Sequence, residues 1–157
     1  MKKIVITGAC GFIGSNISEY YLKKGFKVFG IDNLMTGALK NVEDFINDEN
    51  FVLIQHDVRK KIYIKENIDY ILHFASPASP SDYLKFPIET LEIGSIGSKN
   101  ILDFAVEKRA RILLASTSEI YGDPLEHPQS ESYYGNVNPI GPRGVYDEAK
   151  RYLEALA

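Results

Sequence analysis

A glycine-rich turn close to the N-terminus constrains the fold more than any other feature of this sequence. Residues 8–14 read GACGFIG, a G-x-x-G-x-x-G pattern that follows a β-branched run at residues 3–7 and precedes a helical pattern at about 12–24. Glycines at these positions allow a tight turn and a close backbone approach to a pyrophosphate, whose charge lies at the helix N-terminus. Because any tight strand-to-helix turn can use glycines, the pattern gains weight only from other positions.

Apolar runs and helical stretches alternate along the chain. Four further runs are expected to be strands, at residues 27–31, 51–55, 70–74 and 111–115. The helical stretches between them are weak near 39–46 and 60–67 and strong at 88–108. Such alternation predicts a doubly wound α/β fold of Rossmann type, because right-handed crossovers place helices on both faces of a parallel sheet. At 157 residues the chain fits one domain, and we expect residues 1–157 to form it.

The stretch 118–142 contains seven glycine and proline residues, too many for a helix or a central strand. Long loops in compact domains usually carry function, so we expect a working loop here. A last helical pattern begins at Arg143 and continues to Ala157 without a terminating glycine or proline. We therefore interpret the end of the sequence as an interruption of the domain.

The charge and residue composition of the chain indicate which kinds of binding partner to expect. The net charge of -3 provides no basic field for a polyanion, so we expect no nucleic-acid partner. The single cysteine, Cys10, cannot form an intramolecular disulfide, which suits a reducing cytosol. No apolar stretch approaches the roughly 18 residues that a membrane-spanning helix needs. We therefore expect a soluble, cytoplasmic protein with no membrane partner, and we assign no metal ligands.

Acidic and small residues after the strands predict a dinucleotide site. Asp32 follows Gly14 by 18 residues, close to the spacing of a carboxylate that binds the adenosine ribose, and its charge should repel a 2′-phosphate and favour NAD. Asp57 could contact the adenine amino group, although a solvated loop aspartate explains it equally well. The backbone near Ala75 could approach the cofactor, or form a plain turn. The predicted cofactor contacts are Gly8, Gly11, Phe12, Ile13, Gly14, Asp32, Asn33, Asp57, Val58, Ala75 and Lys150.

Tyr146 and Lys150 are four residues apart, which places them on one face of a helix. A nearby ammonium stabilises a phenolate and lowers the tyrosine pKa, so the pair could remove a proton from a sugar hydroxyl while hydride passes to NAD. Alone, a Y-x-x-x-K pattern is common on any exposed helix. The hydroxyls of residues 116–118, after the fifth strand, could orient a substrate oxygen or could simply cap the strand end.

Four longer segments carry a family resemblance: TGACGFIGS at 7–15, HFASPASPSDY at 73–83, LLASTSEIYGDP at 113–124 and NPIGPRGVYDEAKR at 138–151. With them the chain resembles the extended short-chain dehydrogenase family of NAD-dependent epimerases and dehydratases, and within it most closely the UDP-glucuronate decarboxylases. The triplet Thr117-Ser118-Glu119 is similar to the decarboxylase pattern. Related dehydratases usually carry Asp-Glu after the threonine, and epimerases usually have a small residue in place of the glutamate.

The resemblance implies a decarboxylation of UDP-glucuronate to UDP-xylose. In the family, NAD+ oxidises the sugar at C4, the resulting β-keto acid loses CO2, and NADH reduces the ketone. By resemblance Tyr146 is the base and Lys150 its electrostatic partner, while Thr117 and Ser118 orient the hydroxyl and Glu119 positions the ring or transfers a proton. The alternatives are a 4,6-dehydratase, a 4-epimerase or a truncated non-catalytic NAD-binding module.

The chain also departs from the family pattern. Gly94 stands where relatives usually have an asparagine. Family members continue for roughly as many residues again, so we expect the C-terminal strands, the substrate-binding domain and a carboxylate-binding arginine to be absent from this chain. Members commonly dimerise through two helices of each subunit, here residues 88–108 and 143–157, which makes a homodimer a possible partner alongside the UDP-sugar.

Overall fold

The computed structural model describes residues 1–157. The chain divides into two compact units. The sheet unit comprises Met1–Ser76 and Ile96–Ala115, and the helical unit comprises Pro77–Ser95 and Ser116–Ala157. Each unit is described by itself below.

Five parallel strands build the sheet unit. They are β1 (Lys3–Thr7), β2 (Lys27–Asp32), β3 (Phe51–Gln55), β4 (Tyr70–His73) and β5 (Arg111–Leu114), in the order β3-β2-β1-β4-β5. In the central register Val5 of β1 lies opposite Phe29 of β2 on one side and Ile71 of β4 on the other. The strands are apolar and the inner ones are buried, as expected for a sheet covered on both faces. The predicted parallel α/β fold is confirmed.

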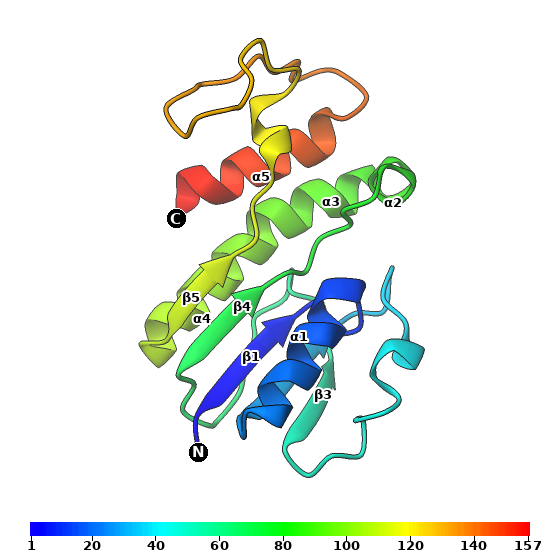
Figure 1. Cartoon of the computed structure of the whole chain (residues 1–157), viewed down its shortest axis with the longest axis vertical. Helices are drawn as coiled ribbons and strands as arrows, with labels where there is room; N and C mark the ends of the chain where they lie inside the picture. Colours follow the sequence, from blue (N-terminus) through cyan, green and yellow to red (C-terminus); the bar gives the residue numbers. More distant parts are fainter. The chain divides into compact units, whose positions relative to one another are not determined.

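Two helices flank this sheet. Helix α1 (Phe12–Lys23) crosses in front of the strands and α4 (Ser98–Lys108) lies behind them (Figure 1). Strand order 3-2-1-4-5 with helices on both faces is the Rossmann arrangement, which brings the carboxyl ends of the strands to one edge. Apolar side chains of the strands and their connections form the buried core on one face: Ile4, Ile6, Cys10, Val28, Val42, Phe51 and Leu72.

Two helices that the sequence predicts weakly differ in the structure: the first is shorter than predicted, and the second is not formed. The stretch 39–46 contains only η1, a 3-10 turn at Leu39–Val42. The stretch 60–67 contains no helix. There Ile62 and Ile64 are buried while Tyr63 between them is 72% exposed. Burial that alternates with a period of two is the pattern of an extended segment, not of a helix.

The long helix expected at 88–108 is divided into α3 (Pro87–Glu92), the π-helical η2 (Ile93–Gly97) and α4. Inside the helical unit, a Cβ added to Gly94 would lie 2.5 Å from Cβ and 2.8 Å from Cα of Ala149. Helix α5 (Gly144–Leu156) therefore approaches η2 closely enough to require glycine. A larger side chain, such as the asparagine that the resemblance implies at this position, would not fit beside Ala149 in this arrangement.

The helical unit also contains α2 (Pro80–Lys85), which the sequence analysis missed. Its start carries clear signals, because Ser79 accepts a hydrogen bond from the Asp82 backbone N–H and Pro80 occupies the first turn. The predicted loop begins with the 3-10 turn η3 (Ser118–Tyr121), and the last helix is confirmed as α5. None of the helices is long and apolar enough to cross a bilayer.

Candidate active site

The glycine turn of the sheet unit is held by its own backbone. The N–H of Gly8 donates to the Ile31 carbonyl at 2.8 Å, and the N–H of Gly11 donates to the Gly8 carbonyl at 3.0 Å. A Cβ on Gly14 would lie 2.0 Å from the Gly8 oxygen, so α1 can start this close to β1 only with glycine there. Gly14 therefore allows the close packing of α1 against β1 that dinucleotide-binding turns of this kind require.

The N-terminus of α1 suits an anionic group. Gly11 precedes the helix, no side chain caps it, and the first turn contains no acidic residue. The first N–H groups of a helix have no partner within it, and Phe12 and Ile13 of this turn are exposed, so an anion has access to the turn. These features fit the pyrophosphate of NAD.

Asp32, at the end of β2, joins the glycine turn to the next loop. One carboxylate oxygen, Oδ2, accepts from the Cys10 N–H at 2.8 Å, and Oδ1 accepts from the Leu34 N–H at 2.8 Å. Each carboxylate oxygen has a second lone pair, so Asp32 can still accept from a ribose hydroxyl. Burial raises the pKa of the Cys10 thiol to about 11, with a further contribution from Asp32, so this cysteine packs rather than reacts.

Asp57 has a cationic partner that the sequence analysis missed. The Arg59 guanidinium hydrogen-bonds Asp57 with a shortest N···O distance of 2.7 Å, and Asn33 Nδ2 donates to it at 3.2 Å. Chiefly because of Arg59, the pKa of Asp57 falls to about 2. The short spacing between Asp57 and Arg59 could have predicted this ion pair from the sequence. Val58 lies in the core, where its carbonyl accepts from Asn100 Nδ2 at 2.9 Å.

Thr7 fixes the backbone that follows β4. Its hydroxyl oxygen accepts from the Phe74 and Ala75 N–H groups, each at 3.1 Å, and hydrogen-bonds His73 Nδ1 at 2.8 Å. The Thr7 and His73 side chains are buried. The sheet unit thus brings the glycine turn, Asp32 and Ala75 to the carboxyl edge of neighbouring strands, where dinucleotides bind in such folds.

In the helical unit, Tyr146 and Lys150 lie one turn apart on α5, and Lys150 Nζ is 5.8 Å from the centre of the Tyr146 ring. Lys150 is only 7% exposed, and burial lowers its pKa to about 8. The pKa of Tyr146 is raised by burial and next by Glu119, while a hydrogen bond with Thr117 lowers it. The net shift of the Tyr146 pKa is upward because burial is its largest cause, and a lowering by Lys150 stays a prediction.

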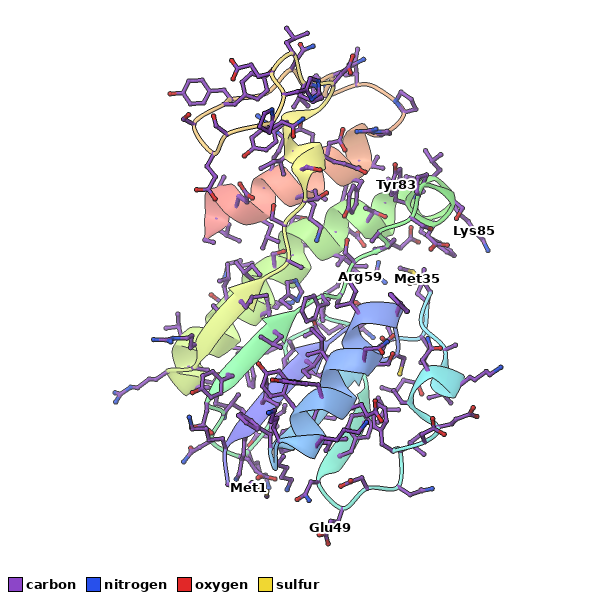
Figure 2. All side chains as sticks on the ribbon, viewed as in Figure 1. Met1, Met35, Glu49, Arg59, Tyr83 and Lys85 are labelled. Carbon is purple, nitrogen blue, oxygen red and sulfur yellow. The ribbon has the colours of Figure 1, made fainter.

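Tyr83 of α2, labelled in Figure 2, is a site neighbour that the sequence analysis missed. Its ring stacks on that of Tyr146, with centroids 5.0 Å apart and planes 9° from parallel. At 1% exposure it is among the most buried large side chains of the chain. Stacking of this kind fixes the orientation of the Tyr146 phenol.

Glu119 lies in η3, where Thr117 Oγ1 accepts from its backbone N–H at 3.3 Å. Arg143, at the start of α5, places Nη2 3.9 Å from Glu119 Oε2 and 3.9 Å from Asp147 Oδ2. Ser118 is exposed. Of the predicted catalytic residues, the helical unit therefore brings together Thr117, Glu119 and Tyr146, with Lys150 on the same face of α5.

Comparison with known proteins decides the family. A family model described as GDP-mannose 4,6 dehydratase matches residues 5–157. The chain belongs to the GDP-mannose 4,6-dehydratase family. This confirms the resemblance to NAD-dependent epimerases and dehydratases, and it accounts for a glycine turn, a parallel sheet and a Tyr/Lys helix in one chain.

Curated relatives of this family member include UDP-glucuronic acid decarboxylase 1 of Xenopus tropicalis, 52% identical over 155 residues, which cover 99% of the chain and 36% of the relative. UDP-glucuronic acid decarboxylase 1 of Arabidopsis thaliana is 47% identical over 99% of the chain and 35% of the relative. The chain thus spans about a third of the length of these two proteins.

Solved structures of the same family share the fold. A UDP-N-acetylglucosamine 4-epimerase from Methanobrevibacter ruminantium has a TM-score of 0.81 at 28% identity, over 99% of this chain and 49% of that one. The UDP-glucose 4-epimerase of Bifidobacterium longum, solved in complex with NAD+ and UDP, has a TM-score of 0.79 at 25% identity, over 99% and 48% of the two chains. The family is therefore one of sugar-nucleotide enzymes in which NAD binding is known.

Proposed function

We propose that this chain supplies the NAD-binding and Tyr146/Lys150 part of an enzyme that converts UDP-glucuronate to UDP-xylose through a 4-keto intermediate. The observation that carries the proposal is the arrangement in the helical unit, where the buried Tyr146, stacked on Tyr83, has a pKa that responds to both Glu119 and Thr117. The identity of 52% to a curated UDP-glucuronic acid decarboxylase supports the same substrate and reaction.

Each residue has a defined task in this proposal. Bound at the glycine turn, NAD+ would accept hydride from C4. Tyr146 takes the proton of the 4-hydroxyl, Thr117 and Ser118 orient that oxygen, and Lys150 contributes positive charge when protonated. The C4 ketone then lies β to the C6 carboxylate and accepts the electron pair of the C5–C6 bond as CO2 leaves. Asp32 selects NAD over NADP because its charge opposes a 2′-phosphate.

The alternative function is a 4,6-dehydration or 4-epimerisation of a sugar nucleotide. The name of the family model and the solved epimerases favour it. Glu119 after Thr117 and Ser118 argues for the decarboxylase, because the other two classes usually differ at these positions.

Product analysis tests the proposal. The full-length protein, which must supply the substrate-binding part expected to be absent from this chain, is incubated with NAD+ and UDP-glucuronate, and we expect CO2 and UDP-xylose to form together. The Tyr146→Phe variant should lose at least about 100-fold in rate, the usual scale for removing an acid–base group. Tyr152→Phe, at a 45% exposed position of the same helix, is the matched control and should keep the rate. A 4-keto-6-deoxy sugar or C4 inversion of UDP-glucose would establish the alternative.

A further inference from the structure

Three buried side-chain oxygens of the chain have no hydrogen-bond partner, and all three lie in the helical unit: Tyr83 Oη, Glu119 Oε2 and Asp147 Oδ1. A buried polar atom left unsatisfied costs roughly 1–3 kcal/mol. Three such atoms in one small region require a physical reason, and the two carboxylates offer one.

Glu119 and Asp147 are close enough for a side-chain hydrogen bond. Two ionised carboxylates only accept hydrogen bonds and repel each other, so such a contact exists only when one of them carries a proton. One shared proton would therefore satisfy oxygens that are unpartnered when both groups are ionised.

The surrounding charges also favour one proton. Asp147 is 5% exposed, and the single cation beside the pair is Arg143, whose Nη2 lies 3.9 Å from an oxygen of each carboxylate. With one shared proton, the pair and Arg143 together are neutral. With none, the pair carries one more negative charge than Arg143 balances, and Asp147 is the more buried of the two carboxylates, so its ionised form bears most of the cost of burial.

The groups that face Asp147 come from three elements: Tyr83 from α2, Glu119 from η3, and Arg143, Tyr146 and Glu148 from α5 and its start. Burial is the main cause that raises the pKa of Asp147. Arg143 lowers it, whereas Glu119 and Glu148 raise it again. The net direction is upward, in agreement with the geometry.

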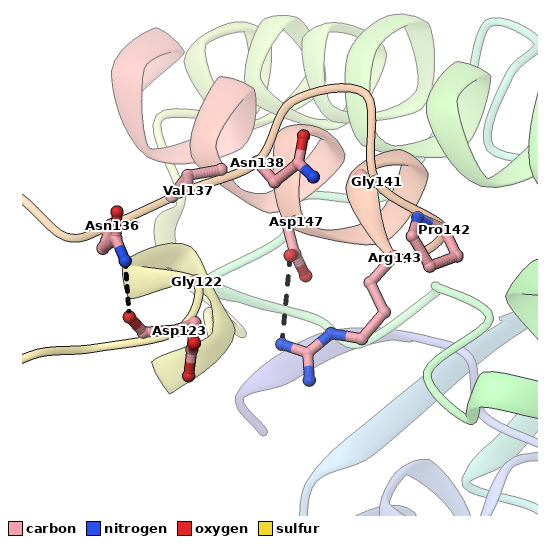
Figure 3. A pocket seen from close by; sticks show the side chains of 10 residues that line it. Gly122, Asp123, Asn136, Val137, Asn138, Gly141, Pro142, Arg143 and Asp147 are labelled. Carbon is pink, nitrogen blue, oxygen red and sulfur yellow. Dashed lines mark hydrogen bonds and ion pairs between the residues drawn. The ribbon is translucent and has the colours of Figure 1, made fainter.

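A pocket connects this pair to solvent. Its volume is about 400 Å³, and both Arg143 and Asp147 line it, with the ion pair between them visible in Figure 3. The remaining walls come from the loop residues Gly122, Asp123, Asn136, Val137, Asn138, Gly141, Pro142 and Gly144. Asp147 therefore lies between open water on one side and Glu119 on the other.

We propose that Asp147 is a positioning residue that shares one proton with Glu119 and exchanges it with water in this pocket. The proton passes from the Asp147 carboxyl to the Glu119 carboxylate and back, so that one group is protonated while the other is ionised, and a proton lost from Asp147 to water in the pocket is replaced one for one. The pair thereby holds a proton beside the Tyr146 phenol. A catalytic role for this proton rests on the proposed function. The sharing of a proton between Asp147 and Glu119 does not depend on it.

The test is a pH titration of the folded chain by carbon NMR with labelled aspartate and glutamate, and Asp147→Asn identifies the Asp147 signal. We expect the Asp147 carboxyl carbon to titrate in two steps, because a coupled site responds to its partner's ionisation. In Glu119→Gln it should titrate in one step, at a pH lower by at least about 1 unit. Glu126→Gln, which removes an exposed carboxylate of the loop, should leave the curve unchanged.

An Asp147 midpoint that stays in place in Glu119→Gln overturns the inference. If that variant does not fold, a single-step curve in the wild-type chain overturns it instead, and a two-step curve supports it. Neither titration requires the enzyme to convert a substrate. Failure to release CO2 from UDP-glucuronate would therefore refute the proposed function without affecting the result of the titration.

Discussion

Replacing Gly14 with alanine is expected to lower the free energy of unfolding by at least about 3 kcal/mol, the upper part of the range for an added methyl group in a packed site. The new Cβ would lie 2.0 Å from the Gly8 oxygen and 2.7 Å from the Gly8 carbonyl carbon. Both are backbone atoms, so no side chain can move away and the turn or α1 must shift. Urea denaturation of the two chains measures the change.

Asn16→Ala, at an exposed position of α1, is the control for the Gly14 variant. Surface substitutions of this kind usually stay within about 0.5 kcal/mol. A Gly14→Ala chain as stable as Asn16→Ala would mean that the close packing of α1 on the glycine turn is not as described.

Raising the pH from 7 to 10.5 is expected to stabilise the wild-type chain relative to its Lys150→Met variant by about 1–3 kcal/mol. The shift of the Lys150 pKa from 10.5 to about 8 corresponds to about 3 kcal/mol at roughly 1.4 kcal/mol per pKa unit. Burial is the cause of this shift, so below pH 8 folding must bury a charged ammonium. Between about pH 8 and 10.5 the folded chain loses this proton before the unfolded chain does, so wild-type stability rises with pH, whereas methionine has no proton to lose.

Unfolding by denaturant at pH 7, 9 and 10.5 checks this prediction. Lys99→Met is the control, because Lys99 is exposed in a surface pair with Asp103, and its effect should be small and independent of pH. A stability difference between wild type and Lys150→Met that stays constant from pH 7 to 10.5 would contradict the prediction.

The sequence was sufficient to predict the sheet. Each β strand is a continuous apolar run, and the alternation with helices restricts the topology to a parallel sheet. The weak helix predicted at 60–67 is wrong because Ile62 and Ile64 are buried on either side of the exposed Tyr63, which is the period of an extended segment. The division of 88–108 by η2 depends on the approach of Ala149, a long-range contact that no local pattern contains.

Site residues were predictable where a motif carries them and not where packing does. The glycine turn and the Tyr/Lys pair are visible as motifs, and they gain weight from the strands and acidic residues found at the expected places around them. Tyr83 and Asp147 do not, because their importance lies in a stacked ring and in a carboxyl contact between η3 and α5. Their local sequences, S-D-Y-L and Y-D-E-A, resemble those of any exposed helix. The roles of the motif residues and a homodimer through residues 88–108 and 143–157 stay predictions.

Calorimetric titration of the 157-residue chain with NAD+ and with NADP+ tests the central claim most directly, because every proposed step depends on the cofactor. We expect saturable NAD+ binding and weaker NADP+ binding, with the preference reduced at least about tenfold in Asp32→Asn and unchanged in Asp44→Ala, an exposed control. Absence of saturable NAD+ binding, or a preference that Asp32→Asn does not alter, would contradict the account.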